Sequence, residues 1–397
     1  MAQRYPIIRL RSGKSHVLRK GHPWLFSGAI ANLDQRTLRP GDTVSVVSHD
    51  GQSMGIGIVN PRSDIAVRML TSDAAAVVDT AFWRNRIRQA SSLRSKSVPP
   101  RTNAFRLINA EGDFMPGLVV DRYDSVLVMS IGTAGMDRFR HDIVQALVDE
   151  AQPGSILERS EGKSREREGL PGRTELCYGA QIPSGMDIEE NGYAFFVDVF
   201  SGQKTGFFLD QRSNRELAKR LSPGMQVLNA FSYTGAFAVY CAAGGALRVV
   251  SVEASDASNR IASRNLDANC FAAEIHPVLT ADVFGYLRES TEQFGLVILD
   301  PPAFAKSQRD VQQAARGYKD INLMAMRRLI PGGFLMTFSC SNFIDVDLFE
   351  RIVMAAAVDA KTPLQLLETL GPGPDHPTLL AHPEGRYLKG LLLRNLT

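Results

Sequence analysis

The stretch VLNAFSYTGAFAV, residues 227–239, joins an apolar run to a helical segment through a short turn. The apolar run has the length of a buried strand, and it ends at the turn FSYTG, residues 231–235. A buried strand that leads directly into a helix is the repeating unit of α/β folds with a parallel sheet. This stretch therefore predicts the start of an α/β domain.

Four more apolar runs follow the first one. They are LRVVSVEAS (247–255), IHPVLTADVF (275–284), FGLVILDPP (294–302) and GGFLMTFSCS (332–341). Helical segments such as ASNRIASRNLDANC (257–270) separate most of these runs. The alternation predicts a parallel sheet with helices on both faces, whose ligands bind outside the carboxyl ends of the strands. The informative residues are therefore those at which each strand ends.

Acidic residues at two strand ends indicate a cofactor. The second run ends at Glu253, which can accept hydrogen bonds from both hydroxyls of a ribose, and the third ends at Asp282, near the expected place of an adenine amino group. Either acid alone is more often a helix N-cap or a surface group. The turn before them has one glycine, Gly235, and so lacks the glycines that a dinucleotide pyrophosphate requires. Together these features predict S-adenosylmethionine. The predicted cofactor contacts are Asn229, Ala230, Phe231, Ser232, Tyr233, Thr234, Gly235, Glu253, Asp282 and Asp300.

The fourth run ends in DPPAF, residues 300–304. Two consecutive prolines remove two backbone donors and restrict two φ angles, so the carboxylate of Asp300 is held with little freedom. A capping aspartate at a strand end is the structural alternative, but it requires neither two prolines nor an aromatic residue. The D-P-P-x-F pattern is typical of methyltransferases that act on nucleobase nitrogens or ring carbons.

The fifth run ends at Cys340, between Ser339 and Ser341. A buried cysteine is usually an inert small hydrophobic residue. At the same sheet edge as Asp300 and a methyl donor, however, a thiolate has a chemical use. Its addition to C6 of cytosine turns C5 into a nucleophilic carbon, while Asp300 shares a proton with ring N3. We therefore predict Cys340 and Asp300 as the catalytic residues.

The composition restricts the class of protein. A chain of 397 residues with 44% hydrophobic and 22% charged residues is typical of a soluble globular protein of two or three domains. No apolar stretch approaches the ~20 residues of a membrane span, and the N-terminal sequence lacks the apolar run of a signal peptide. The four cysteines form no CxxC pair and the seven histidines show no ligand spacing. We therefore expect no metal and a reducing, cytoplasmic compartment.

Two parts of the chain, whose net charge is only +3, contain many basic residues and no acid. Residues 1–33 hold Arg4, Arg9, Arg11, Lys14, Arg19 and Lys20. Residues 82–110 hold Arg84, Arg86, Arg88, Arg94, Lys96, Arg101 and Arg106. A single block of this kind is usually a solvated face, but two of them favour contact with a nucleic acid.

The chain divides into three predicted domains of a multidomain α/β protein. Short strands with turn signals at Pro40-Gly41-Asp42 and Asp50-Gly51 predict a small β module over residues 1–70. A helix over residues 75–98 and a hairpin around Tyr123-Asp124 predict a central α+β domain over residues 75–190. Residues 195–397 form the α/β domain described above.

Beyond these local patterns, the chain resembles bacterial 23S ribosomal RNA cytosine-C5 methyltransferases that carry an N-terminal PUA domain. The resemblance runs nearly from end to end and rests on the order and spacing of several motifs. These are GHPWLFSGAI (21–30), GQKTGFFLDQR (202–212), VLNAFSYTGAFAV (227–239), ILDPPAF (298–304), RGYKDIN (316–322), TFSCS (337–341) and HPEGRYLKG (382–390).

The resemblance implies a PUA RNA-binding module at 1–70, a class I (Rossmann-like) S-adenosylmethionine methyltransferase domain at 195–397, and Cys340 as the nucleophile. It also implies that residues 202–212 form a hairpin over the cofactor, with Gln211 near it. The implied partner is ribosomal RNA, either 23S RNA or an assembly intermediate, and the oligomeric state stays open, with a homodimer as one option. The predicted RNA contacts are Arg9, Arg11, Lys14, Arg19, Lys20 and Trp24.

Two alternative functions stay open at this point. Ribosomal guanine methyltransferases share the D-P-P-x-F pattern, so the protein could methylate a base nitrogen while Cys340 is idle. A PUA-type RNA-binding protein with an inactive second domain is the other alternative. The presence of Glu253, Asp282, Asp300 and Cys340 argues against an inactive domain, and Cys340 favours cytosine C5 over a guanine nitrogen.

Overall fold

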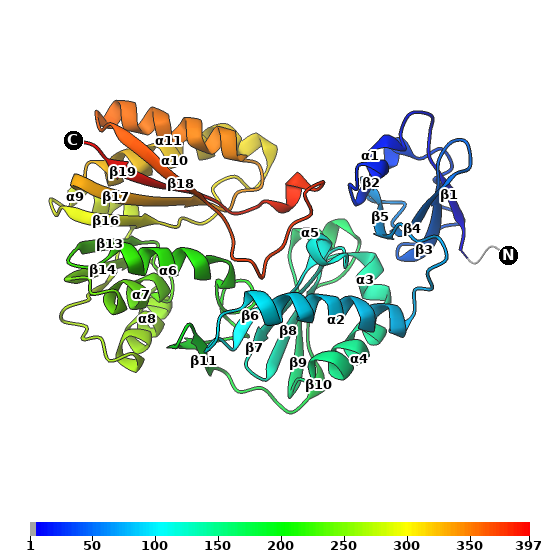
Figure 1. Cartoon of the computed structure of the whole chain (residues 1–397), viewed down its shortest axis with the longest axis horizontal. Coiled ribbons are helices and arrows are strands. Elements are labelled where there is room, and N and C mark those ends of the chain that lie inside the picture. The colour runs from blue at the N-terminus through cyan, green and yellow to red at the C-terminus, as the bar shows by residue number, and fades with distance from the viewer. Residues whose placement is uncertain (1–4) are drawn as a thin grey trace. The chain divides into compact units, whose positions relative to one another are not determined.

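The computed structural model describes residues 5–397, apart from the side chain of Ser164 (Figure 1). Arg4 of the first basic block lies outside the described residues. The chain forms two compact units, and each contains segments that are distant in the sequence. Unit 1 comprises 1–188, 197–209 and 374–385, and unit 2 comprises 189–196, 210–373 and 386–397.

The first sheet of unit 1 is a five-stranded sheet in the order β1-β3-β4-β5-β2. Its strands are β1 (Ile7–Arg9), β2 (Trp24–Phe26), β3 (Asp42–Val47), β4 (Ser53–Val59) and β5 (Ile65–Thr71), with the short helix α1 (His16–Arg19) between β1 and β2. In β3 the alternate residues Val44 and Val46 are fully buried in the core of this sheet. This period of two is the pattern of strands with one buried face, and it forms the expected small β module.

The second sheet of unit 1 has the order β10-β9-β8-β7-β6. Its strands are β6 (Ala104–Asn109), β7 (Leu118–Tyr123), β8 (Val126–Ile131), β9 (Ser155–Ser160) and β10 (Arg173–Gly179), accompanied by α2 (Thr80–Ser97), α3 (Ala134–Arg138), α4 (Arg140–Ala151) and α5 (Lys163–Arg167). The predicted hairpin is β7–β8, and Asp124 adopts the left-handed φ of 53° in its turn. The expected helix over 75–98 is α2, which ends just before the two prolines.

Unit 2 contains a seven-stranded sheet in the order β15-β14-β13-β16-β17-β19-β18. Its strands are β13 (Gln226–Ala230), β14 (Arg248–Glu253), β15 (Val278–Thr280), β16 (Phe294–Leu299), β17 (Leu329–Ser339), β18 (Leu364–Leu370) and β19 (Lys389–Asn395). The five strands from β13 to β17 are parallel, as the alternating pattern predicts. The separate hairpin β11 (Met186–Glu190) and β12 (Tyr193–Val197) forms a two-stranded sheet.

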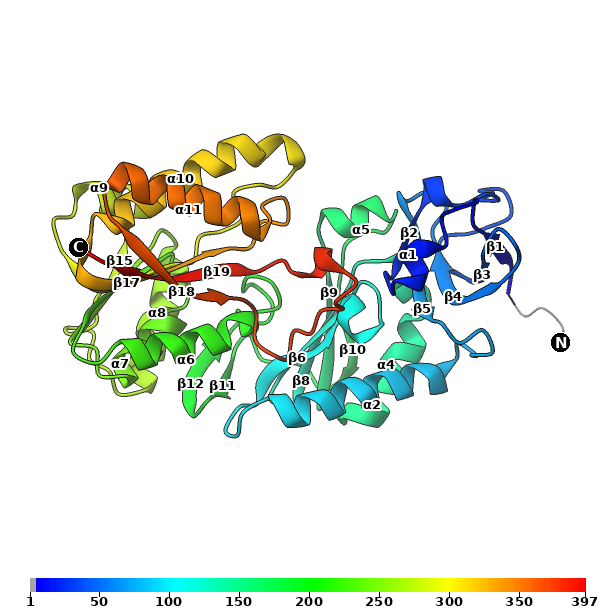
Figure 2. The same ribbon diagram turned by 45° about the horizontal axis from the view of Figure 1, so that its top comes forward.

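Helices cover both faces of this sheet, which confirms the predicted α/β class. The helices are α6 (Arg212–Leu221), α7 (Ala236–Ala243), α8 (Asp256–Ala268), α9 (Val283–Glu289), α10 (Val311–Met326) and α11 (Val346–Ala360). Figures 1 and 2 show α10 and α11 on one face and α6, α7 and α8 on the other. Between these layers β16 and the last five residues of β17 are entirely buried, which explains the continuous apolar sequences there.

The five apolar runs do not account for the last two strands of the sheet. β19 pairs antiparallel with β17, and β18 pairs antiparallel with β19. The sequence KGLLLRN of β19 is apolar enough for a strand, but it follows a long irregular segment and no helical pattern. Its position next to β17 is therefore a tertiary result. It places Lys389, the first residue of β19, directly opposite Ser339.

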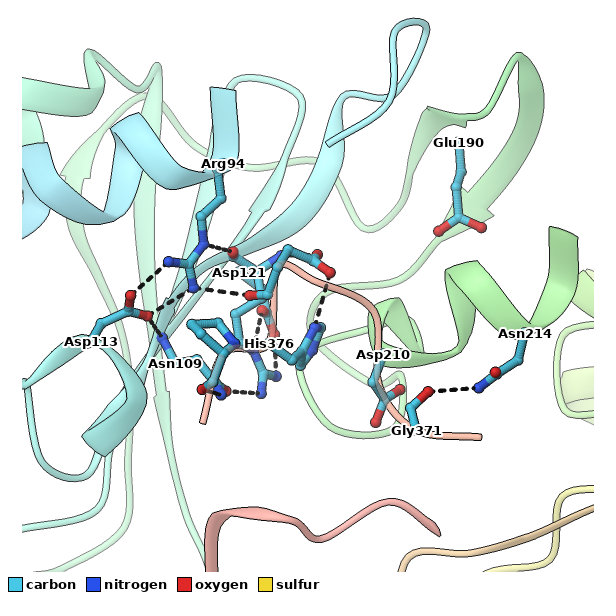
Figure 3. Close-up of polar contacts among 12 residues, drawn as sticks. Arg94, Asn109, Asp113, Asp121, Glu190, Asp210, Asn214, Gly371 and His376 are labelled. Atoms are coloured by element: carbon cyan, nitrogen blue, oxygen red, sulfur yellow. Dashed lines mark hydrogen bonds and ion pairs between the residues drawn. The ribbon is translucent and has the colours of Figure 1, made fainter. Parts of the chain in front are cut away.

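The segment 374–385 belongs to unit 1 and is anchored there by Arg94. The Arg94 guanidinium, 1% exposed, donates to both carboxylate oxygens of Asp113 at 2.6 and 2.7 Å. It also donates to the backbone carbonyl oxygen of Asp375 at 2.9 Å (Figure 3). The carboxylate of Asp375 in turn accepts a hydrogen bond from the backbone N–H of Arg106 at 3.1 Å. One buried guanidinium thus holds together α2, the loop after β6 and the segment 374–385.

We expect Arg94→Met to lower the free energy of unfolding of unit 1 by about 3–5 kcal/mol, because it leaves the buried carboxylate of Asp113 without its cation. The matched control is Arg88→Met, in which a 63% exposed guanidinium loses its bond to Glu150 and the cost is about 0–1 kcal/mol. Both tryptophans, Trp24 and Trp83, lie in unit 1, so tryptophan fluorescence during urea unfolding reports on this unit alone. If Arg94→Met and Arg88→Met lowered the free energy of unfolding equally, Arg94 would not anchor the segment 374–385.

Candidate active site

The turn after β13 has a strained backbone. Phe231 and Tyr233 adopt left-handed φ angles of 59° and 46°, which are unfavourable for residues with a side chain. Gly235 has φ 75°, and a Cβ atom there would lie 2.8 Å from the Cβ of Ala262 on α8. Glycine is therefore required at 235 both for the backbone conformation and for the close approach of α8. Strained turns of this kind gather at ligand sites.

Two hydroxyls in this turn are buried without a hydrogen-bond partner. Among the described residues, nothing accepts from or donates to Ser232 Oγ or Thr234 Oγ1. Buried polar groups are normally satisfied, so these two indicate a missing polar partner such as a ligand or water. The neighbouring Asn229 is also buried, and its amide donates to Ser251 Oγ at 3.4 Å. The turn therefore fits a polar ligand at the carboxyl end of β13.

Glu253, at the end of β14, fastens this turn from the side. One of its carboxylate oxygens accepts from the backbone N–H of Tyr233 at 3.2 Å, and the other accepts from that of Ser255 at 3.0 Å. Ser255, not Glu253, caps helix α8. The carboxylate is only half-buried, so it keeps lone pairs for a further donor. The helix-cap alternative therefore does not apply to Glu253, and its contact with a ribose stays a prediction.

Asp282 has a different environment. It caps helix α9, and its Oδ2 accepts from the backbone N–H of Gly285 at 2.7 Å. The side chain is exposed at the same sheet edge as Glu253. The helix-cap interpretation therefore holds for Asp282. The predicted contact with adenine stays a prediction for the second carboxylate oxygen.

Backbone hydrogen bonds join the strand ends to one another. The backbone N–H of Asp300 donates to Ala230 O at 3.4 Å, and that of Ala281 donates to Glu253 O at 3.1 Å. The D-P-P-x-F loop is further fixed by Phe304, whose ring packs 4.5 Å from the ring of Tyr318 on α10. The structure thus brings Asp300, half-buried, next to the turn that follows β13.

The two serines around Cys340 hold it in place. Ser339 and Ser341 are both fully buried, and the hydroxyls of both lie 3.0 Å from the hydroxyl of Tyr318. Ser341 Oγ also accepts from the backbone N–H of Ala305 at 3.3 Å, which ties this loop to the D-P-P-x-F loop. These contacts fix the backbone on both sides of Cys340. Cys340 is half-buried at the carboxyl end of β17.

Tyr318 on α10 is a residue of the site that was not predicted from the sequence. Its ring is fully buried, and burial raises the pKa of its hydroxyl, so the group stays a neutral hydrogen-bonding partner of the two serines. The residue lies in the motif RGYKDIN, whose Tyr-x-x-Ile spacing is that of a buried helix face. A phenol at such a position requires a polar partner, and this is the signal that could have predicted its contact with a strand-end hydroxyl.

The expected hairpin over the cofactor at 202–212 is not formed. Residues 198–208 form turns without a strand, and the short helix η3 (Leu209–Gln211) follows. A Cβ atom on Gly202 would lie 2.4 Å from the backbone oxygen of Asp198, because the chain turns tightly there. Gln211 itself is buried: its Oε1 accepts from Asn214 at 2.6 Å, and its Nε2 has no partner among the described residues. Asn214 also donates to Gly371 O at 3.0 Å (Figure 3).

The first basic block forms an exposed cationic surface in unit 1. Arg9, Arg11, Lys14, Arg19 and Lys20 are all exposed, and within residues 5–397 none of them forms a salt bridge. The three arginines donate only to neutral oxygens. Their positive charge is thus available to an anionic partner.

Trp24 differs from these five residues, because its contacts lie within unit 1. Its indole N–H donates to Glu111 at 2.8 Å, and its ring lies 4.4 Å from the ring of His382. Arg68 also packs over the ring. These contacts account for the position of Trp24 without RNA, so its RNA contact stays a prediction. Phe26 on the same strand is 50% exposed.

The second basic block is largely neutralised by acids from other parts of the sequence. Arg84 and Arg88 pair with Glu150, and Arg88 is the largest cause of the lowered pKa of that carboxyl. Arg106 pairs with Asp121. Arg94 is buried against Asp113, and Arg86 donates to a backbone oxygen. The acid-free run in the sequence is therefore not a continuous cationic surface, which corrects its interpretation as a nucleic-acid contact.

Two further observations concern the described part of the chain. No helix between residues 5 and 397 combines the length and apolarity that crossing a membrane requires. The same residues contain no cluster of three or more histidine, cysteine, aspartate or glutamate side chains arranged to hold a metal ion.

Two parts of the chain match known protein families. Residues 8–72 match a PUA-like domain, and residues 174–394 match the S-adenosylmethionine-dependent methyltransferase family. Two solved structures share the fold at 22% identity and a TM-score of 0.83. One is described as "A putative sam-dependent methyltransferase from Streptococcus mutans" and covers 98% of this chain and 100% of its own. The other is described as SMU.776, "a putative methyltransferase complexed with SAH", and covers 98% and 99%.

A curated relative from Shewanella frigidimarina, named ribosomal RNA large subunit methyltransferase I, is 41% identical over 98% of both chains. The partnerless hydroxyls of Ser232 and Thr234 and the half-buried Glu253 fit the S-adenosylmethionine that such a domain uses. The chain therefore belongs to the S-adenosylmethionine-dependent methyltransferase family, within the group named ribosomal RNA large subunit methyltransferase I.

Proposed function

We propose that this protein forms 5-methylcytosine in the 23S RNA of the large ribosomal subunit, with Cys340 as a covalent nucleophile. The observation that carries the proposal is the position of Cys340. It follows β17 at the sheet edge where β13 and β14 end, and it is half-buried between two fully buried serines that contact Tyr318. The name of the relative, ribosomal RNA large subunit methyltransferase I, supports the choice of substrate class.

The cofactor supplies an electrophilic methyl group, and the protein makes the base able to accept it. C5 of cytosine is a weak nucleophile because the ring is aromatic. In the proposed reaction, the Cys340 thiolate forms a bond to C6, and the C5–C6 π electrons move onto C5 and N3. Asp300 donates a proton to N3, or shares one with it, as negative charge grows there. Once C5 carries the methyl group, a base removes the C5 proton, the C5–C6 double bond forms again and the Cys340 thiolate is expelled. N3 returns its added proton to Asp300.

Residues of the turn after β13 hold the cofactor in this proposal. Glu253 binds the ribose hydroxyls, Asp282 reaches the adenine, and the buried hydroxyls of Ser232 and Thr234 find their polar partners in the ligand. Asn229, Ala230, Phe231, Tyr233, Gly235 and Gln211 complete the proposed cofactor contacts. The first basic block binds RNA phosphates, an assignment that the match of residues 8–72 to a PUA-like domain supports.

Methylation of a guanine nitrogen is the competing reaction, because the D-P-P-x-F loop occurs in enzymes of that kind too. It requires no nucleophilic thiol, so the placement of Cys340 favours cytosine. Nucleoside analysis of RNA methylated in vitro separates the two reactions: we expect 5-methylcytosine as the product. Methylguanine would overturn the proposal, and the absence of any methylated nucleoside would favour a non-catalytic RNA-binding protein.

Cys340→Ala is expected to abolish methyl transfer and to leave the dissociation constant of S-adenosylmethionine within a few-fold, because the thiol serves the base and not the cofactor. RNA that contains a C5-blocked cytosine analogue should form a covalent complex with the wild-type protein and none with the variant, as resolved by denaturing electrophoresis. Cys270→Ala, which removes an exposed thiol, is the control and should behave as wild type. Methyl transfer by Cys340→Ala would rule out the covalent mechanism.

Glu253→Ala is expected to raise the dissociation constant of S-adenosylmethionine roughly ten- to a hundred-fold, since a hydrogen bond to a charged group contributes about 1.5–3 kcal/mol. Part of the effect comes from release of the Tyr233 backbone, which Glu253 fastens. Asp256→Ala, on the exposed start of α8, is the control and should not change the titration. Unchanged calorimetric binding by Glu253→Ala would assign this acid to turn structure alone.

A variant without the positive charges of the first basic block should bind RNA more weakly and with a smaller dependence on salt. Its five substitutions to glutamine are at Arg9, Arg11, Lys14, Arg19 and Lys20. Each phosphate contact contributes about 0.7–0.9 to the slope of log affinity against log salt, so two contacts among the five lower it by roughly 1.4–1.8. The control changes Arg84 and Arg88, whose charges Asp149 and Glu150 already balance, and should keep the wild-type slope. If the variant with all five substitutions has the same slope as the wild-type protein in filter binding, the first block is only a solvated surface.

A further inference from the structure

Lys389 lies beside the residues that hold Cys340. It is the first residue of β19, pairs in register with Ser339, and is 3% exposed. Its Nζ donates to the backbone oxygen of Ser341 at 2.7 Å and to that of Tyr387 at 2.8 Å. A long cationic side chain is thus folded back against the carbonyl of the residue that follows Cys340.

This buried ammonium has no carboxylate partner. Across residues 5–397, no aspartate or glutamate oxygen lies within ion-pair distance of Lys389 Nζ. Its two hydrogen-bond acceptors are neutral carbonyl oxygens, which satisfy donors but supply no negative charge. Lysine is almost never fully buried without an anion, because removing the charge from water is costly. The environment of Lys389 is therefore incomplete until an anion forms nearby.

Four titratable groups near Lys389 could supply a negative charge, and Cys340 is the best candidate among them. Tyr318 on α10 faces the same loop, but burial raises the pKa of its hydroxyl. Asp345, before α11, is exposed and caps that helix. Asp300 follows β16, but among residues 5–397 its carboxylate does not lie within ion-pair distance of Lys389 Nζ. Cys340, adjacent in sequence to Ser341, is the remaining group that can become an anion on losing a proton.

The electrostatics of Lys389 agree with this geometry. Burial lowers the pKa of its ammonium to about 8, while the charges of Cys340 and Asp345 oppose this decrease. The interaction is reciprocal: a thiolate that stabilises the ammonium is itself stabilised by it. At neutral pH the lysine is protonated, so its charge favours ionisation of the thiol. The effect fades as pH rises through the pKa of the ammonium.

We propose that Lys389 is the counter-ion of the Cys340 thiolate and keeps this nucleophile ionised for attack on the base. This inference rests on the proposed role of Cys340. The thiol proton passes to solvent before the attack, and Lys389 retains its own proton throughout. When the sulfur bonds to C6 it becomes a neutral thioether, and when the thiol is expelled the same ammonium stabilises the leaving thiolate. Lys389 acts through Cys340 and is therefore a positioning residue.

The test measures the ionisation of Cys340 directly, without RNA. Full-length protein is treated with iodoacetamide over a range of pH, and mass spectrometry follows alkylation at Cys340, with the exposed Cys270 as internal reference. We expect Lys389→Met to raise the apparent pKa of Cys340 by about 1 or more, the shift typical for loss of an opposite charge at close range. At pH 7 the alkylation rate should fall only about threefold, because the more basic thiolate is also more nucleophilic.

Three variants separate charge from structure. Lys389→Arg keeps the charge and should retain the wild-type apparent pKa of Cys340, whereas Lys389→Gln keeps a donor without the charge and should behave like Lys389→Met. Lys389→Met removes the donors to Ser341 and Tyr387 and could therefore fail to fold, which circular dichroism and S-adenosylmethionine binding would reveal. In that case Lys389→Gln takes its place in the measurement. Lys361→Met makes the same change at an exposed position on the end of α11 and should leave the profile unchanged.

The outcomes distinguish this proposal from the proposed function. An unchanged pH profile of Cys340 in folded Lys389→Gln would overturn the counter-ion role, whatever nucleoside the enzyme makes. A raised apparent pKa with retained cofactor binding would support it. Methyl transfer by Cys340→Ala would instead contradict the proposed function. The pH profile of Cys340 alkylation in the wild-type protein and the Lys389 variants would still show whether the two residues interact.

Discussion

The parallel pairing of β13 with β14 and β16 is the constraint on which the site depends. Because these strands run in one direction, their carboxyl ends meet at one edge, and residues 70 positions apart become neighbours. The backbone bonds Asp300 N–Ala230 O and Ala281 N–Glu253 O then join the loops beyond the strands. No single loop builds the site: each contributes one or two groups, and the sheet sets their spacing.

A second layer of contacts behind the sheet edge orients the groups that face outward. Tyr318 on α10 bonds both serines that flank Cys340, and its ring packs against Phe304 of the D-P-P-x-F loop. The antiparallel direction of β19 matters in the same way. A strand parallel to β17 would begin at the opposite edge, whereas β19 begins beside the end of β17 and so places Lys389 there. A buried helix residue and the last strand thus support the loop that holds the cysteine.

The two basic blocks show how far charge can be interpreted from a sequence. Both lack acids over about thirty residues, yet only the first remains a cationic surface. In the second, the arginines are neutralised by Asp113, Asp121 and Glu150, which belong to later elements and lie beyond the end of the block. The loss of free charge follows from antiparallel pairing of β6 with β7 and packing of α2 against α4, which local composition does not contain.

The sequence by itself determined the α/β class, the order of its parallel strands along the chain, and the candidate residues at their ends. It could do so because apolar runs, a required glycine and a proline pair act through local backbone physics. It also contained the motif that includes Tyr318, but not that residue's partners. Only the tertiary structure decided that residues 202–212 form turns and the short helix η3 in place of a hairpin, that β19 lies beside β17, and that the second basic block is largely neutralised. These outcomes depend on contacts between residues far apart in the chain, where burial and pairing with distant groups outweigh local preference.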